Sequence, residues 1–341
     1  MAASSLKSLA VPLSIEPIEA KLVTELPTDL GWQFEPKWDG FRCLAFKAGD
    51  EVELKGRSGK SLARFFPDMV AALHRLDVDR LAIDGELVIQ LGDALSFGAL
   101  QMRLHPAASR VRKLAAEHPA RLILFDCLMS ESGESLLDRP LSERRRALER
   151  LDLSSGGGVF SLSPVTDDVA QAKTWLLTTG GDLDGVIAKR LEGTYRPGER
   201  AMLKVKNIRT ADCVVGGFRY EQASRQVGSL LLGLYNGEGK LDHVGFTSTI
   251  PRAERPELTR LLEGLIEPPG FTGDAPGGAS RWSTERTGDW QPLRPELVVE
   301  VRYDHVTGDR FRHGTTLVRW RKDKPPRQCT FEQLARTKKG E

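Results

Sequence analysis

Short runs of alternating apolar and polar residues, separated by turn residues, fill much of the first half of the chain. Residues 32–47 hold two such runs on either side of Asp39-Gly40, and an Asp-Gly pair between apolar runs is a common hairpin signal. The β-type pattern recurs in three more segments: 51–57, 80–89 and 121–129. This region therefore predicts several short strands and a hairpin turn at Asp39-Gly40.

Other segments carry apolar residues at helical spacing. In residues 67–76, which Pro67 opens, Val70, Leu73 and Leu76 fall on one helical face. Two further helices are predicted, one with Pro140 in its first turn and one ended by Gly180-Gly181: 137–151 and 167–181. Two short strands are predicted to follow them: 184–190 and 201–207.

The pattern changes after Asn207. Short β-rich runs separated by glycine-containing turns make up most of the remaining chain, which predicts a small all-β barrel. The Pro- and Gly-rich stretch 267–280 is predicted to be a loop within it. A length of 341 residues fits two domains, and we place them at 1–208 and 209–341.

Composition narrows the class of protein. Hydrophobic residues make up 40% of the chain and charged residues 28%, which is ordinary for a globular protein with a core. We find neither an apolar run near the ~20 residues of a membrane helix nor a secretory signal, so we expect a cytoplasmic protein without membrane attachment. The widely separated Cys43, Cys127, Cys213 and Cys329 argue against a zinc finger or disulfide framework and favour buried thiols.

Charge is informative through its distribution. The net charge of +2 is close to neutral, but residues 302–327 hold eight Arg or Lys against three Asp and no Glu. Such a cationic segment is a candidate for phosphate contacts, although a solvated charged face explains the charge equally well. The segment 56–61 resembles a phosphate-binding P-loop, but Leu54 stands where that loop needs its first glycine. We therefore exclude a P-loop nucleoside triphosphatase.

Lys37 is a candidate nucleophile. It lies next to the predicted turn at Asp39-Gly40, and a lysine attacks only as the neutral amine, which burial or nearby positive charge favours. Lys189, Lys204 and Lys206 stand at two other predicted strands. If these cations surround Lys37, they could favour its neutral form and also hold a phosphate.

Three acidic residues form a second candidate group. Asp84 and Glu86 are two residues apart in a predicted strand and so share a face, and Asp184 begins another strand. Carboxylates in apolar strands are costly unless they are paired or bind a cation. Mg²⁺ beside phosphate would suit them, while ordinary salt bridges to the lysines are the alternative.

Seven short motifs follow one another in a recognisable order. They are Lys37-Trp38-Asp39-Gly40-Phe41-Arg42, Arg57-Ser58-Gly59, Asp84-Gly85-Glu86, Phe125-Asp126, Asp184-Gly185-Val186-Ile187-Ala188-Lys189, Lys204-Val205-Lys206 and Arg321-Lys322-Asp323-Lys324. With these motifs the chain resembles the covalent nucleotidyltransferases, most closely the ATP-dependent DNA ligases and among them the small bacterial LigC type. One departure is Asp184, where the family usually has glutamate.

The resemblance implies a role for each position. Lys37 would be the catalytic residue that carries AMP, Glu35 would contact the adenine amino group, and Phe125 would stack on the base. The remaining positions would be ribose or phosphate contacts (Arg42, Arg57, Glu86), metal ligands (Asp184, Glu86), α-phosphate contacts (Lys204, Lys206) and, within residues 321–324, contacts to the pyrophosphate leaving group (Arg321, Lys324).

The resemblance also implies an architecture and a function. It implies an α+β fold, with a nucleotidyltransferase (adenylation) domain of antiparallel sheets and helices at 1–208 and an OB-fold β-barrel at 209–341. The protein would be a monomer that uses ATP with Mg²⁺ or Mn²⁺ and seals 5′-phosphate/3′-hydroxyl nicks in duplex DNA during repair. An RNA ligase or an mRNA-capping enzyme shares the K-x-D-G motif, and a non-catalytic nucleic-acid-binding protein is the second alternative.

Overall fold

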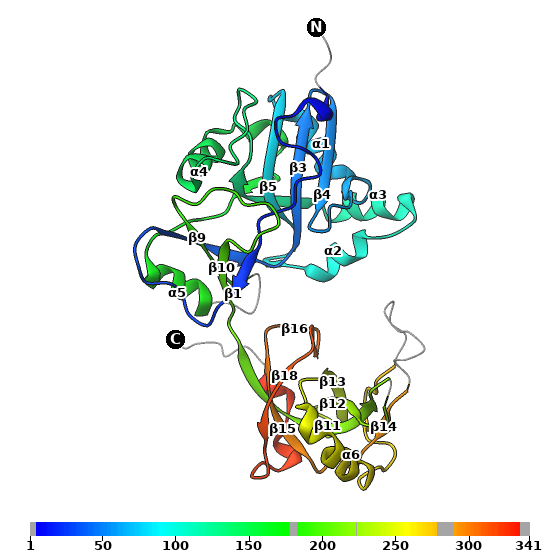
Figure 1. Ribbon diagram of the computed structural model, residues 1–341. Coiled ribbons are helices and arrows are strands. Elements are labelled where there is room, and N and C mark those ends of the chain that lie inside the picture. The colour runs from blue at the N-terminus through cyan, green and yellow to red at the C-terminus, as the bar shows by residue number, and fades with distance from the viewer. Residues whose placement is uncertain (1–4, 178–182, 223, 278–288, 335–341) are drawn as a thin grey trace. The chain divides into compact units, whose positions relative to one another are not determined.

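The computed structural model describes residues 5–177, 183–222, 224–277 and 289–334 (Figure 1). The chain divides into two compact units, residues 1–207 and 208–341. Each unit has apolar side chains buried in a core of its own. None of the helices in the described ranges is long and apolar enough to cross a membrane.

The first unit is built on two sheets. One has the strand order β1 (Ala20–Leu22), β10 (Met202–Val205), β9 (Leu183–Arg190) and β2 (Trp32–Trp38). The other has the order β4 (Glu51–Gly56), β3 (Phe41–Ala48), β5 (Arg80–Leu91), β7 (Ala120–Cys127) and β8 (Phe160–Leu162), and the short β6 (Ala94–Leu95) pairs with β5. The predicted strands are therefore present, and Lys206 lies just beyond the end of β10.

The predicted hairpin at Asp39-Gly40 is wrong. The strands on its two sides belong to different sheets: β2 pairs with β9, whereas β3 pairs with β4 on one edge and β5 on the other. Both edges of β3 are thus occupied by other partners. A Cβ added to Gly40 would lie 2.2 Å from the carbonyl oxygen of Leu87, so glycine is needed because the chain crosses close to β5 there.

Helices cover the sheets of the first unit. The predicted helices appear as α1 (Pro67–Arg75), α4 (Leu141–Arg150) and α5 (Val169–Leu177). Pro140 precedes α4 as its N-cap instead of lying in the first turn, and Gly180-Gly181 lies outside the described residues. The structure adds two helices that the apolar pattern did not predict, α2 (Phe97–Arg103) and α3 (Ala108–Glu117).

The second unit is a β-barrel. Its sheet has the order β13 (Leu241–Thr247), β12 (Val227–Tyr235), β11 (Arg209–Tyr220), β15 (Val298–Tyr303) and β18 (Thr316–Trp320), with β14 (Gln291–Pro292) beside β11. A bridge between Thr247 and Thr315 joins the two sheet edges. The unit also holds α6 (Arg255–Glu263) and the hairpin of β16 (Val306–Thr307) and β17 (Arg310–Phe311). Of the predicted loop 267–280, residues 267–277 are described and form no helix or strand.

The cysteines are confirmed as buried free thiols: Cys43, Cys127, Cys213 and Cys329.

Candidate active site

A cavity of about 690 Å³ lies in the first unit and is lined by residues from both of its sheets. The structure brings most of the predicted site residues to this cavity. Those that line it are Glu35, Lys37, Arg42, Arg57, Glu86, Phe125 and Lys204. Because these positions are spread over nearly 170 residues of sequence, the strand pairing of the two sheets is what assembles them.

Lys37 forms an ion pair at the edge of this cavity. Its Nζ lies 2.6 Å from Oδ2 of Asp184, and Nζ of Lys206 lies 3.1 Å from the same oxygen. The antiparallel register of β2 and β9, which places Lys37 opposite Gly185, brings the two residues together. The Asp184 carboxylate thus lies between two lysines and holds both.

Local charges shift the pKa values of the groups around Lys37. Burial alone would raise the pKa of Asp184, but the charges of Lys37 and Lys206 outweigh it and lower that pKa below its usual value. Burial lowers the pKa of Lys204, and the positive charges of Lys37 and Lys206 lower it further. The cluster is therefore rich in positive charge, as a binding site for phosphate requires.

Arg42 pairs with one of the two acids of β5, Asp84. Its Nε and Nη2 donate to the two carboxylate oxygens of Asp84 at 2.5 and 2.6 Å, and Tyr195 Oη donates to Asp84 Oδ2 at 2.7 Å. Asp84 is fully buried and paired, whereas Glu86 lines the cavity. Burial raises the pKa of Glu86 to about 7, although Arg42 and Lys37 act in the opposite direction.

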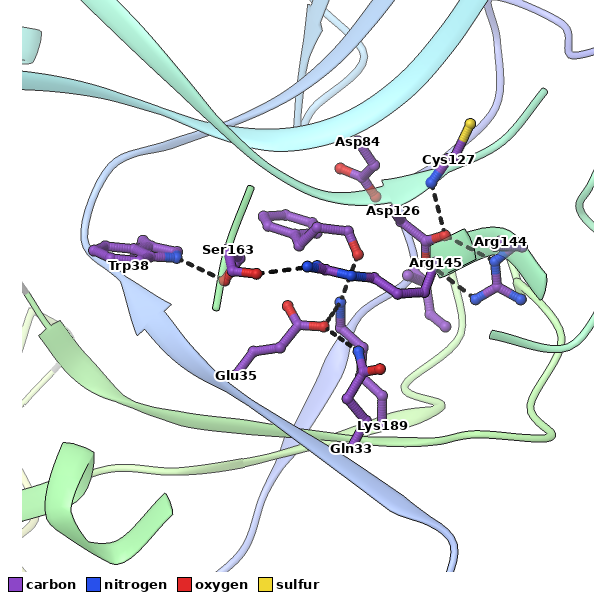
Figure 2. A network of polar contacts seen from close by, with 12 residues as sticks. Gln33, Glu35, Trp38, Asp84, Asp126, Cys127, Arg144, Arg145, Ser163 and Lys189 are labelled. Carbon is purple, nitrogen blue, oxygen red and sulfur yellow. Dashed lines mark hydrogen bonds and ion pairs between the residues drawn. The ribbon is translucent and has the colours of Figure 1, made fainter. Parts of the chain in front are cut away.

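Glu35 and Phe125 form a second part of the cavity wall, and Figure 2 shows Glu35 with its partners Gln33 and Lys189. Oε1 of Glu35 accepts hydrogen bonds from Gln33 Nε2 at 2.8 Å and from Lys189 Nζ at 2.7 Å. Nζ of Lys189 and the guanidinium carbon of Arg42 each lie 4.7 Å from the centre of the Phe125 ring. Lys189 therefore pairs with Glu35 and packs on Phe125, which differs from the predicted grouping of Lys189 around Lys37.

The motif beside Phe125 has a structural role. Asp126 is buried and accepts from Arg144 Nε at 2.8 Å and Nη2 at 3.0 Å (Figure 2). Nearby, Ser163 Oγ accepts from Trp38 Nε1 at 3.0 Å, and the Ser163 carbonyl accepts from Arg145 at 3.0 Å. These bonds fix β7 and the end of β2, the strands that carry Phe125 and Lys37.

Arg57 lies at the exposed end of β4, and its side chain is 70% exposed. Its Nη2 lies 2.7 Å from Oε1 of Glu19, a residue that also lines the cavity.

Sequence reasoning missed Glu19, Gln33 and the pairing of Lys189 with Glu35. Glu19 belongs to none of the motifs, whereas the two-residue spacing of Gln33, Glu35 and Lys37 on one strand was a signal for Gln33.

Arg321 and Lys324 lie in the second unit. Nη1 of Arg321 lies 2.9 Å from Oδ1 of Asp212, and Nζ of Lys324 lies 3.6 Å from Oδ2 of the same residue. Arg321 also pairs with Asp323 at 2.8 Å. The two cations therefore share Asp212 as an anchor on β11.

The acidic residues of the site are the candidate ligands for a metal ion. In the described parts of the chain, no group of three or more His, Cys, Asp or Glu residues is arranged to hold an ion. Asp184 and Glu86 are two carboxylates that both interact with Lys37. Carboxylate oxygens are donors of the type that Mg²⁺ accepts, since this ion typically takes one or two carboxylates and completes its shell with water and phosphate oxygens.

Comparison with known proteins covers both units. The model described as "ATP dependent DNA ligase domain" matches residues 14–206, and "ATP dependent DNA ligase C terminal region" matches 223–324. DNA ligase C2 of Mycolicibacterium smegmatis is 45% identical over 336 residues, covering 94% of each chain. DNA ligase C of Mycobacterium tuberculosis is 43% identical over 347 residues, covering 96% of each.

A solved structure shares the fold. It is titled as a structure–function analysis of Lig E DNA ligases that bind DNA with a minimal scaffold. It has a TM-score of 0.58 and 17% sequence identity, and the alignment covers 90% of this chain and 100% of that one. The predicted α+β fold class is confirmed.

Proposed function

Because this chain belongs to the ATP-dependent DNA ligase family, we propose that Lys37 is the nucleophile that becomes adenylylated. The observation that supports this most is its position: Lys37 and Lys204 both line the cavity, and Lys206 binds Asp184, the partner of Lys37. A phosphate that entered here would meet a cluster of cations beside an amine able to attack it.

The reaction proceeds in three steps. The neutral amine of Lys37 attacks the α-phosphorus of ATP, a P–N bond forms as the P–O bond to pyrophosphate breaks, pyrophosphate leaves, and the nitrogen releases a proton to solvent. The 5′-phosphate at a nick then attacks the same phosphorus, which breaks the P–N bond, transfers AMP to the DNA end and lets the Lys37 nitrogen take up a proton from solvent. The 3′-hydroxyl finally attacks the 5′-phosphorus, loses its proton and releases AMP, which leaves a phosphodiester bond.

The protein's own groups position these reactants. Asp184 holds Lys37 and Lys206 in place, and the amine must leave this ion pair before it can attack. Lys204 and Lys206 bind the α-phosphate and offset the charge that develops in the transition state. Arg42, Arg57 and Glu86 bind the ribose or nearby phosphate, and Arg321 and Lys324 orient the leaving pyrophosphate.

The base would be recognised by Glu35 and Phe125. Hydrogen bonds from Gln33 and Lys189 fix the Glu35 carboxylate, so it accepts a hydrogen bond from the adenine amino group. Phe125 provides the stacking face. A bound Mg²⁺ held by Asp184 and Glu86 would supply charge neutralisation for the phosphates.

We also propose the substrate, the cellular setting and the oligomeric state. We expect nicked duplex DNA as the substrate, repair as the setting, and a cytoplasmic monomer as the working form. The family assignment supports the DNA substrate. The barrel, as an OB-fold, is a common platform for nucleic acids.

Intact-protein mass spectrometry tests the central claim. The purified chain is treated with Mg²⁺ and ATP, and the modified peptide is mapped. We expect one adenylyl group on Lys37 with ATP and no guanylyl group with GTP, followed by sealing of nicked DNA in preference to nicked RNA. An adduct on another lysine would refute the assignment, and a guanylyl adduct would favour a capping-type enzyme.

A further inference from the structure

The segment before β1 forms a fixed part of the cavity wall. The Ile18 N–H donates to Tyr195 Oη at 3.1 Å, and the Ile18 carbonyl accepts from Arg42 Nη2 at 3.2 Å. The Glu19 N–H donates to the carbonyl of Glu199 at 2.8 Å, and the Glu19 carbonyl accepts from the Met202 N–H at 3.1 Å. Backbone groups on both sides of the Glu19 side chain are therefore held by the same unit, which makes Glu19 a fixed point at the cavity.

The side chain of Arg57, unlike the backbone of Glu19, is not fixed by the surrounding structure of the first unit. It follows β4 in a tight turn in which Gly59 has φ +73°, and its side chain is 70% exposed. Its Nε and Nη2 donate to Oε1 of Glu19 at 3.0 and 2.7 Å. A long exposed arginine samples many rotamers unless a partner restricts it, and Glu19 is such a partner.

We propose that Glu19 is a positioning residue, which holds the Arg57 guanidinium at the cavity so that it can contact the nucleotide. This inference rests on the proposed ribose or phosphate contact of Arg57. The Glu19 carboxylate is ionised at neutral pH, since the hydrogen bond from Arg57 lowers its pKa despite some desolvation.

The negative charge of Glu19 also repels the phosphates of the nucleotide, which would weaken ATP binding. Three cations surround it and oppose that repulsion: Arg57, Arg200 and Lys204. The side chain of Glu19 is 26% exposed, so solvent and salt screen its charge further. Orientation of Arg57 should therefore outweigh repulsion, and the two effects predict opposite changes in ATP binding.

The test uses the full chain and measures self-adenylation against ATP concentration. We expect Glu19→Ala to raise the ATP concentration for half-maximal rate about fivefold, the size of an exposed charged contact, with the maximal rate nearly unchanged. Glu19→Gln keeps a hydrogen-bond acceptor and should cause at most about a twofold rise. In an Arg57→Ala background, Glu19→Ala should add nothing, since the group it positions is gone.

Asp29→Ala is the matched control, because Asp29 Oδ2 forms an exposed ion pair with Arg190 Nη2 at 2.6 Å and neither residue lines the cavity, so its ATP dependence should stay like that of the unmodified chain. A fall in the half-maximal ATP concentration for Glu19→Ala would assign repulsion to Glu19. An effect that persists without Arg57, or an Arg57→Ala variant with normal ATP dependence, would also overturn the proposal. Complete absence of a lysyl adduct in the unmodified chain would refute the proposed function instead.

Discussion

At the scale of single residues, the Asp184 carboxylate is shared between Lys37 and Lys206 through one oxygen. This arrangement places the amine before ATP arrives, and it also means that the amine must exchange a carboxylate partner for the phosphate. Asp184 is one methylene shorter than the glutamate usual in the family, yet it reaches both lysines. The shorter side chain is therefore compatible with the local pairing seen here.

Replacement of Lys37 tests the nucleophile directly. Lys37→Ala and Lys37→Arg should both abolish the adenylyl adduct, because arginine keeps the positive charge but is never neutral at working pH. Both variants should retain binding to nicked DNA in a gel-shift assay, with Lys37→Arg closer to the unmodified chain. An ordinary adduct yield in either variant, measured by mass spectrometry, would show that another residue attacks ATP.

Glu86 gives a pH prediction for stability. Its pKa is about 7 in the folded chain against 4.5 for an ordinary glutamate, so the folded state binds the extra proton between these values. The associated stability is present below about pH 4.5 and is lost as pH rises through about 7. At pH 8, without nucleotide or metal, Glu86→Gln should stabilise the chain by roughly 1–3 kcal/mol, since one pKa unit is ~1.4 kcal/mol.

Denaturant titrations of both proteins at pH 5 and pH 8 provide the measurement. The difference in unfolding free energy between the variant and the unmodified chain should be larger at pH 8 than at pH 5. A difference that does not depend on pH would show that Glu86 does not titrate in this range.

The residues of the site could be predicted to unequal extents. Lys37, Arg42 and Phe125 stand in recognisable motifs, and the structure places them at one cavity. Glu19 could not be predicted, because its importance arises from a contact with Arg57 across 38 positions of sequence. The partner of Lys189 also depends on strand register, which the sequence pattern does not specify.

At the scale of elements, most strands were predictable because burial on a sheet imposes alternation, but their partners were not. The Asp39-Gly40 pair has the composition of a hairpin turn, yet β2 and β3 pair with distant strands instead. Tertiary pairing thus overrode the local turn preference. The short helix α2 was missed because its 7 residues hold too few periods to reveal an amphipathic pattern.

Gly185 tests the close packing of β9 on β10. It has φ +144°, and an added Cβ would lie 2.1 Å from the Val205 carbonyl oxygen. Gly185→Ala should therefore cost several kcal/mol, about 1–3 kcal/mol from the backbone conformation and more from the clash, and it should slow self-adenylation by displacing Asp184.

The matched control is Gly92→Ala, also at positive φ (+61°) but with no atom within 4 Å of the added Cβ. It should lose only about 1–2 kcal/mol for the left-handed backbone and keep its adenylation rate. Equal losses of unfolding free energy in the two variants would show that β10 moves away at no cost.

At the scale of the whole molecule, the chain consists of two units with separate cores. The cavity that holds Lys37 is lined by first-unit residues, while Arg321 and Lys324 belong to the second. We propose that the first unit carries the residues that react with ATP, and that the second unit assists the departure of pyrophosphate and the binding of DNA.

Removal of residues 211–341 should therefore affect the steps unequally. We expect the truncated chain to lose most of its reaction with ATP, yet to seal nicks that already carry AMP at a weak but measurable rate. In the full chain, Arg321→Ala with Lys324→Ala should reproduce the defect with ATP. Quenched-flow measurement of adduct formation checks both, and a truncated chain that reacts with ATP at the full rate would contradict the role of these two cations.

The chain passes from one sheet to the other shortly after Lys37, and this affects how a bound nucleotide stabilises the first unit. Lys37 belongs to one sheet, whereas Glu86 and Phe125 belong to the other. A nucleotide that contacts all three would therefore crosslink the two sheets. Amide hydrogens of β2 and β5 should then exchange with solvent more slowly, and in concert, once ATP or AMP is bound. Once AMP is covalently attached to Lys37, this crosslink would last until the adenylyl group is transferred to the DNA end.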